Sequence, residues 1–272
     1  MPPLVSVIIP TYNRVNFLAH ALKSIWSQDY PNIEIIVIDD ASTDGTKEYL
    51  AALPNVEKYR FQLHNGQCST RNMGLDAAKG KYIQLLDDDD ALIPGIISKH
   101  VKYLEEHPEI DLVYGDMMLS NTFVMDNPKI KESAEFRPDI RPGTPIDYDM
   151  KKALLKHLKK PLNPRHSILY LYTPNYKPLC ISTGTGLFRK NNVRYDPKIE
   201  ENWNCSADVD FWGQLIMAGL KFAYLPGLAL ELRVHGENLT SQVPPGTPKR
   251  WAVRRYIYKK LKLQIKKDDN KK

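Results

Sequence analysis

Four consecutive aspartates, Asp87 to Asp90, directly follow an apolar segment that ends at Leu86. Carboxylates held together at the end of a strand make one another harder to ionise, and a divalent cation relieves that repulsion. Mg²⁺ and Mn²⁺ bind one or two carboxylates and take further ligands from substrate phosphates. The run therefore predicts a site for a divalent metal and a nucleotide diphosphate, with a solvated acidic turn as the alternative.

The elements that position these carboxylates alternate between strand and helix patterns. β-Branched apolar runs at 4–10 and 33–38 predict buried parallel strands. Apolar residues at helical spacing over 17–25, with Asn16 placed to cap, predict a helix between them. The alternation continues with a helix opened by Ser42 and Asp44 that runs through Leu53, a strand at 56–61, a helix at 68–78 and a strand at 82–86.

This alternation predicts an α/β fold with a doubly wound sheet. In such sheets ligands bind beyond the carboxyl ends of the strands. The segments that follow strand ends are Pro10–Arg14, Asp39–Asp44 and Asp87–Asp90, and all three are rich in polar groups. We therefore expect the ligand site at these segments.

The second half of the chain is less regular. Periodicity fades over about 117–178, which predicts an insertion, and long irregular segments in compact enzymes are often lids or binding loops. A strand-like segment at 181–189, a helix at about 209–218 and an apolar segment at 222–232 follow. The last segment places Val253, Ile257, Leu261 and Ile265 four apart among Lys and Arg, the pattern of an amphipathic helix.

The charge of the chain is unevenly placed. The net charge is +6, but residues 249–272 hold eleven Lys and Arg against two Asp, so the part before them is slightly acidic. Basic character confined to a tail argues against a nucleic-acid-binding surface on the folded body. The three cysteines, Cys68, Cys180 and Cys205, form no CxxC pair and are expected to be reduced thiols. With neither a membrane-spanning apolar run nor a signal-peptide pattern, the expected compartment is cytoplasmic.

Five stretches of the sequence occur in the order found in one enzyme family, and on these the chain resembles the family-2 glycosyltransferases of GT-A fold. They span most of residues 4–241 and read VSVIIPTYNR (5–14), IVIDDASTDGT (36–46), STRNMGLDAAKGKYIQLLDDDD (69–90), SADVDFW (206–212) and LRVHGENLTS (232–241). Any one of them is a weak signal, but five in register are specific. The resemblance implies a mixed sheet of GT-A type with a Rossmann-like nucleotide-binding half.

The resemblance also implies roles within the acidic run. The family pattern LDxDDxxxP aligns with Leu86, Asp87, Asp89, Asp90 and Pro94. It implies that Asp87 faces the ribose of a nucleotide-sugar donor and that Asp89 binds the metal.

Other donor-binding residues are implied in the same way. Thr11, Tyr12 and Arg14 are expected in the nucleotide pocket, Asp40 is expected to accept a hydrogen bond from uracil, and Arg71 is expected near the nucleotide or its phosphates. The chemistry agrees, because a carboxylate accepts well from an imide N–H and an aromatic ring packs on a base. Helix capping by Asp40 or Asp44 and a surface salt bridge of Arg71 are the structural alternatives.

Asp208 occupies the position of the family's catalytic base. Ala207 stands where many members carry a glutamate, and the loss of that like charge should make Asp208 easier to ionise. Arg233 and His235 form the family's RxH element, whose imidazole is expected at the metal or the diphosphate. The alternative for Asp208 is a residue that only starts a helix, and the alternative for His235 is a purely structural histidine.

These expectations combine into one description of the chain. Residues 1–241 form the catalytic domain, with a nucleotide-sugar-binding half at 1–116, an insertion and acceptor region at 117–205 and the base and RxH elements at 206–241. Residues 242–272 form a basic tail or helix, which either packs on the domain or contacts an anionic membrane surface. Glu200, Glu201 and Trp203 are acceptor-side candidates by position only.

The expected reaction is the transfer, with inversion, of a hexose-type sugar from a UDP-sugar to an acceptor hydroxyl. The acceptor is a glycan, a lipid-linked molecule or a protein-linked molecule. Mn²⁺ or Mg²⁺ is the expected cofactor, and no nucleic acid is expected as a partner. A noncatalytic sugar-nucleotide or carbohydrate-binding protein and a nucleotidyltransferase are the alternatives. The sequence has no GxxxxGK[ST] loop, and its first strand ends in PTYN where a dinucleotide-binding fold carries GxGxxG. Both observations disfavour the nucleotidyltransferase.

Overall fold

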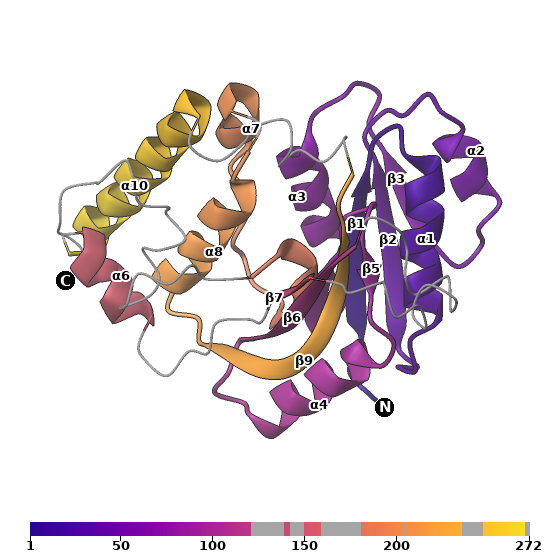
Figure 1. Ribbon diagram of the computed structural model, residues 1–272, viewed down its shortest axis with the longest axis horizontal. Helices are drawn as coiled ribbons and strands as arrows, with labels where there is room; N and C mark the ends of the chain where they lie inside the picture. The colour runs from indigo at the N-terminus through magenta and orange to yellow at the C-terminus, as the bar shows by residue number, and fades with distance from the viewer. Residues whose placement is uncertain (121–138, 142–149, 159–180, 204, 236–246, 270–272) are drawn as a thin grey trace.

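The structure is a computed structural model that describes residues 1–120, 139–141, 150–158, 181–203, 205–235 and 247–269. Its centre is a nine-stranded mixed sheet with the order β3-β2-β1-β4-β8-β6-β9-β5, and β7 pairs with β6 beside this path. Helices cover both faces (Figure 1). The predicted α/β fold and mixed sheet are confirmed.

The first half contains the parallel strands that the sequence predicts. β1 (Val5–Thr11) lies between β2 (Ile33–Asp39) and β4 (Tyr82–Leu85), and β3 (Glu57–Arg60) extends the sheet beyond β2. Successive residues of β1 serve opposite faces, as expected for a fully buried strand. Ile9 packs in the cluster that contains α1 (Val15–Trp26), whereas Ile8 packs in the cluster that contains α3 (Gln67–Ala77).

The second half adds strands of both directions to the edge at β4. β8 (Gly186–Arg189) runs antiparallel to both β4 and β6 (Leu112–Ser120). β9 (Phe222–Arg233) is parallel to β6 and antiparallel to β5 (Ala91–Leu92). β6 continues past residue 117, where the sequence predicts an irregular insertion, because β9 gives it a pairing partner as far as Ser120.

Two helices begin differently from the sequence prediction. α1 begins at Val15 rather than after Asn16, because the carboxylate of Asp44 accepts the backbone N–H of Val15 at 2.8 Å and so caps the helix from another loop. α2 (Thr46–Ala51) begins after Gly45, which has a φ of +92°. Asp44 accepts the Thr46 N–H as well, so one carboxylate holds the start of both helices.

Four helices gather beyond α3 on one side of the sheet (Figure 1). They are α6 (Met150–Leu158), α7 (Pro197–Trp203), α8 (Ala207–Met217) and the C-terminal α10 (Pro248–Asp269). α10 packs on the other three. Its predicted apolar stripe faces the domain: Val253, Ile257 and Leu261 are fully buried, and Ile265 packs beside them.

The opposite face of the sheet is covered by α1 and α4 (Ile96–Glu106), an unpredicted helix that packs its apolar side on β6 and β8. Along the parts of the chain that the structure describes, no helix combines the length and the apolar character needed to cross a membrane. Of the predicted insertion, only β6 beyond 117, β7 (Asp139–Arg141), α6 and residues from 181 onward are described. Cys180 lies outside the described residues.

Candidate active site

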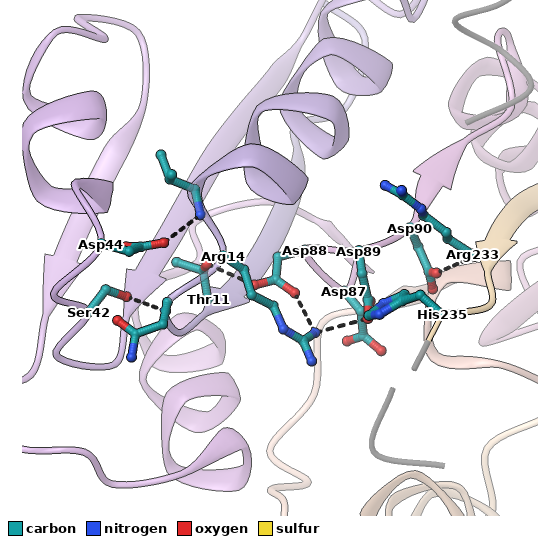
Figure 2. Close-up of polar contacts among 12 residues, drawn as sticks. Thr11, Arg14, Ser42, Asp44, Asp87, Asp88, Asp89, Asp90, Arg233 and His235 are labelled. Carbon is teal, nitrogen blue, oxygen red and sulfur yellow. Dashed lines mark hydrogen bonds and ion pairs between the residues drawn. The ribbon is translucent and has the colours of Figure 1, made fainter. Parts of the chain in front are cut away.

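The four aspartates lie immediately beyond the end of β4, beside the carboxyl end of β1 (Figure 2). Asp88 accepts a hydrogen bond from the Thr11 hydroxyl at 2.8 Å, and one guanidinium nitrogen of Arg14 lies 3.2 Å from Asp88 and 2.9 Å from Asp89. The sequence predicted that Thr11, Arg14 and the acidic run share a site, and the structure places them in contact. Asp88, to which no role was given, is the residue that joins them.

Burial makes this acidic run hard to ionise fully. Asp88 is 5% exposed, and its burial together with the charge of Asp89 raises its pKa to about 7, against the opposing charge of Arg14. Burial and the charges of Asp89 and Asp87 likewise raise the pKa of Asp90 well above its ordinary value. The carboxylates therefore repel one another in a poorly hydrated place, where additional positive charge would be stabilising.

His235 joins the acidic run from the far end of β9. Its Nε2 atom lies 3.0 Å from Oδ2 of Asp89 (Figure 2). Its ring also stacks on Phe17 of α1, with centroids 4.7 Å apart. Arg233 contacts the same Phe17 ring at 4.6 Å, and its backbone N–H donates to Asp90 at 3.1 Å. The RxH element thus contacts the acidic run twice, through Arg233 with Asp90 and through His235 with Asp89.

The pair of Asp89 and His235 brings a carboxylate oxygen and an imidazole nitrogen together, which are ligand types that Mn²⁺ accepts. No group of three or more His, Cys, Asp or Glu side chains within the described ranges is arranged to hold a metal. A divalent ion bound by this pair would need further ligands, and donor phosphate oxygens are of the right kind. The residues present therefore fit a metal that binds together with a nucleotide diphosphate.

A pocket of about 300 Å³ opens beside the acidic run. Its lining includes Thr11, Tyr12, Arg14 and Asp40, which the sequence placed in a nucleotide site, and also Asp88, His64 and Glu200. Tyr12 is 42% exposed. Of the acidic run only Asp88 lines this pocket, and the predicted metal residues Asp89 and His235 adjoin it through the contact of Arg14 with Asp89.

Asp40 is fixed by the loop that precedes α3. Its two carboxylate oxygens accept the backbone N–H groups of Asn65 and Gly66, each at 2.8 Å, and Asp40 is 2% exposed. Asp40 does not cap α2, which begins after Gly45. A buried carboxylate with a fixed orientation can read a single N–H group of a ligand.

His64 occupies the space between Tyr12 and Asp40. Its ring stacks on Tyr12 with centroids 4.2 Å apart, and its Nδ1 atom lies 2.8 Å from Oδ2 of Asp40. These are the two interactions that a uracil ring would need here, namely an aromatic face and a carboxylate for its N–H. The sequence analysis missed His64, although its place after β3, at the carboxyl edge of the sheet, could have indicated it.

Glu200, an acceptor-side candidate by position, reaches the start of α3 instead. Its carboxylate accepts the backbone N–H groups of Gln67 and of Cys68, the latter at 2.6 Å. A carboxylate at a helix N-terminus satisfies unpaired N–H groups and interacts well with the helix dipole. Glu200 therefore links α7 to the pocket, whereas Glu201 is exposed and Trp203 packs near the Tyr256 ring at 4.9 Å.

Arg71 is 2% exposed and forms an ion pair with Asp87 at 2.5 Å, so the alternative role, a surface salt bridge, is excluded. Its guanidinium also lies 5.1 Å from the centre of the Tyr195 ring. The pair joins two residues that the resemblance places at the donor. It leaves Asp87 partly exposed, with 25% of its side chain accessible.

Asp208 lies in the first turn of α8, within electrostatic range of Arg71 and Asp87. Burial raises the pKa of Asp208 above its ordinary value, and the charges of Arg71 and Arg250 oppose that rise. Burial is the largest of these effects, so the pKa of Asp208 is raised although no glutamate stands beside it. A raised pKa suits a residue that must accept a proton near neutral pH.

Comparison with known proteins identifies a matching family. The sequence model described as Glycosyl transferase family 2 matches residues 6–190. An uncharacterized glycosyltransferase of Haemophilus influenzae is 28% identical over 89% of this chain and 68% of its own length. An uncharacterized glycosyltransferase of Rickettsia conorii is 41% identical, but that match spans 38% of this chain and only 17% of the relative.

Solved structures match over more of the chain. TarS 1-349 of S. aureus in complex with UDP-GlcNAc superposes with a TM-score of 0.63 at 18% identity, covering 93% of this chain and 65% of that one. The mannosyltransferase PcManGT of Pyrobaculum calidifontis, in complex with GDP-Man and Mn²⁺, gives a TM-score of 0.55 at 17% identity, over 94% of this chain and 70% of that one. At these identities the likeness concerns the fold.

Proposed function

Because the chain belongs to glycosyltransferase family 2, we propose that it is an enzyme that transfers a hexose-type sugar from a UDP-sugar to an acceptor hydroxyl, with inversion at the anomeric carbon and with a divalent cation. The observation that carries this proposal is a chain of contacts that begins in the pocket: Arg14 and Asp88 line it together with Tyr12 and Asp40, Arg14 contacts Asp89, and Asp89 contacts His235. The aromatic ring of Tyr12 and the charged groups of Arg14 and Asp88 therefore line one pocket.

In the proposed complex the nucleobase stacks on Tyr12 and donates its N–H to Asp40, while Asp87 faces the ribose. Both oxygens of Asp40 already accept backbone N–H groups, so its orientation is set before the donor arrives. Arg14 and Arg71 supply positive charge toward the diphosphate. UDP-GlcNAc in the complex of the fold relative TarS supports a UDP-sugar as the donor class.

Asp89 and His235 would hold the divalent metal, which when bound would stabilise the negative charge that develops on the departing diphosphate. Both residues are held in place without it, Asp89 by Arg14 and His235 by Phe17. The Mn²⁺ in the complex of PcManGT, a protein of similar fold, supports a divalent cation as the cofactor.

Asp208 is the proposed general base. It would accept the proton of the acceptor hydroxyl as the hydroxyl oxygen attacks the anomeric carbon, and the bond from that carbon to the donor phosphate oxygen would break in the same displacement. General-base catalysis of this kind contributes about 10²–10⁴-fold. No covalent link between sugar and enzyme is required, because one displacement inverts the configuration.

The acceptor is proposed to be a hydroxyl of a glycan, lipid-linked or protein-linked molecule. A peripheral membrane contact through the tail cannot use the predicted apolar stripe, since that stripe is buried against the domain. The outer side of α10 remains for such a contact, where Trp251 is 39% and Leu263 59% exposed next to basic residues.

A donor panel tests the proposal directly. The full chain is incubated with Mn²⁺ and each of several UDP-sugars and GDP-sugars, and released nucleotide and the anomeric configuration of the product are measured. We expect nucleotide release with at least one UDP-sugar and an inverted product. Tight UDP binding without turnover on any donor and acceptor would favour the noncatalytic binding protein, and a product with retained configuration would contradict the mechanism.

A further inference from the structure

The helix that carries Asp208 also carries a second, deeply buried carboxylate. Asp210 is fully buried, and its Oδ2 atom accepts hydrogen bonds from Lys260 Nζ and from Gln214 Nε2, both at 2.7 Å. Its Oδ1 atom has no hydrogen-bond partner among the described residues. Because a buried charge is stable only when it is paired, Asp210 depends on Lys260.

Lys260 comes from α10, far along the chain, and it binds a second carboxylate. Its Nζ atom lies 2.9 Å from Oδ2 of Asp196, and the hydroxyl of Tyr256, one turn earlier in α10, donates to the same oxygen at 2.8 Å. Asp196 immediately precedes α7. One ammonium group thus joins the start of α7 to the first turn of α8.

A second contact links α10 to the start of α8. A guanidinium nitrogen of Arg250 lies 3.4 Å from the hydroxyl of Ser206, the residue that precedes α8 and that has a φ of +63°. Non-glycine residues adopt this left-handed conformation only where their surroundings hold them. Between Arg250 and Lys260, the apolar side of α10 packs in the same core cluster as Phe211, Trp212 and Leu215 of α8.

We propose that α10 is part of the catalytic apparatus and that Lys260 is a positioning residue for Asp208, acting through Asp210. The proposal rests on the proposed role of Asp208 as general base. Without the ammonium group, Asp210 would be left buried and unpaired, and the first turn of α8 would move to hydrate it. Asp208 lies in that turn, and an error of about 1 Å in the place of a reacting group can cost about 100-fold in rate.

The test compares Lys260→Met with Lys260→Arg and with Lys259→Met, a neighbouring lysine whose side chain is exposed. Turnover is measured at saturating donor and acceptor, together with the KM for donor and the stoichiometry of UDP binding by calorimetry. We expect Lys260→Met to lower kcat by about 10- to 100-fold with full UDP stoichiometry and a nearly unchanged donor KM. Lys260→Arg should regain part of the loss, and Lys259→Met should match the wild type.

A second variant separates positioning from general destabilisation. Lys260→Met combined with Asp210→Asn removes the ammonium group and the fully buried carboxylate together. Asp196 also loses Lys260, but its side chain is 16% exposed and keeps the hydrogen bond from Tyr256, so kcat should recover relative to Lys260→Met alone. This double variant also serves if Lys260→Met alone fails to fold, since a folded double variant with a kcat near that of the wild type supports the charge argument. If the folded double variant keeps the low kcat of Lys260→Met, the charge argument is contradicted.

Two further results would overturn the inference. One is an unchanged kcat in folded Lys260→Met, and the other is a fall in kcat that merely follows the fraction of protein able to bind UDP. Asp208→Asn, measured in parallel, keeps this inference distinct from the proposed function. If Asp208→Asn is inactive while Lys260→Met is fully active, only the role of Lys260 is wrong; if Asp208→Asn is fully active, the proposed base is wrong.

Discussion

The Nε2 atom of His235 lies 3.0 Å from Oδ2 of Asp89, although the two residues are 146 positions apart in the chain. The contact joins the loop after β4 to the end of β9, and Phe17 of α1 supports the imidazole from behind. Two ligand atoms of the proposed metal site are therefore brought together by the fold itself.

Asp89→Ala should nearly abolish transfer, because it removes the proposed metal-binding carboxylate, while the fold survives the change. Transfer by the wild type should stop in excess EDTA and return when Mn²⁺ is added. The measurements are nucleotide release and circular dichroism, with Glu106→Ala, an exposed acidic residue of α4, as the matched control. Full turnover in EDTA would remove the metal from the proposal.

Asp208→Asn should keep donor binding and lose transfer by about 10²–10⁴-fold, because the amide cannot accept the proton. Since burial raises the pKa of Asp208, the wild-type kcat/KM should fall on acidification at a pH above the ordinary aspartate value of about 3.9. The base works only when ionised, so activity is present above its pKa and lost below it.

Arg250→Gln provides the internal check on that pH profile. The Arg250 charge lowers the pKa of Asp208, so its removal should move the acid limb of kcat/KM to higher pH. An acid limb that stays in place in this variant would mean that another group controls the profile.

His64→Ala should bind UDP more tightly than the wild type, because the imidazole occupies the face of Tyr12 and an oxygen of Asp40 that a nucleobase would use. Aromatic pairs contribute about 0.5–1.5 kcal/mol, so a gain of about two- to tenfold in affinity is expected. Calorimetry with UDP measures it, with His107→Ala, an exposed histidine on another loop, as control. Weaker binding by His64→Ala would show that the histidine packs on the nucleobase instead of competing with it.

His100 should make the protein less stable in mild acid. Its side chain is 1% exposed, neither ring nitrogen has a partner among the described residues, and burial lowers its pKa to about 3, helped by the charge of Lys99. The unfolded chain binds the proton below about pH 6.5, whereas the folded chain does not, so stability falls as the pH drops through that value.

Between pH 7.5 and 5.5 this single group should reduce the free energy of unfolding by about 1.4 kcal/mol. Urea denaturation of the wild type and of His100→Leu at both pH values measures the difference. The variant should lack this part of the pH dependence, and His107→Leu should keep it. Equal pH dependence in His100→Leu and the wild type would show that the imidazole is protonated in the folded state.

The basic tail should bind anionic vesicles weakly, because the apolar stripe of α10 is used inside the protein. Sedimentation with phosphatidylserine vesicles at low and high salt, comparing the wild type with Trp251→Ala and Leu263→Ala, measures what the outer side of the helix contributes. Strong binding that survives high salt and both substitutions would require another membrane-binding surface.

The sequence predicted the structure correctly where the residues of a single segment determine it. The parallel strands β1, β2 and β4 are rich in buried apolar residues. Thr11 and Arg14 at the end of β1 contact the acidic run that follows β4. β6 and α4 were not predicted, although Ile97, Val101 and Leu104 of α4 have helical spacing and are buried. A closer reading of 91–116 could have found them.

Other features depend on contacts between distant segments, which no local pattern records. His64 gains its place only because Tyr12 and Asp40 come from two other strand ends. The carboxylate that caps α1 belongs to Asp44, so the residues adjacent to α1 in the sequence do not indicate it. Lys260 looks like one more basic residue of a lysine-rich tail until α10 is packed on α8.

The position of β9 inside the sheet has a consequence for how the chain folds. β9 pairs in parallel with β6 through contacts such as Leu112 with Phe222, and it also supplies the only partner of the short β5 in the described sheet. Parallel pairs that close long loops are slow to form, because the chain loses loop entropy before the contacts compensate for it. A ribosome-bound chain that lacks β9 would therefore expose the edge of β6. We expect the yield of folded enzyme to depend on how quickly the last segments are synthesised, or on a chaperone that shields that edge.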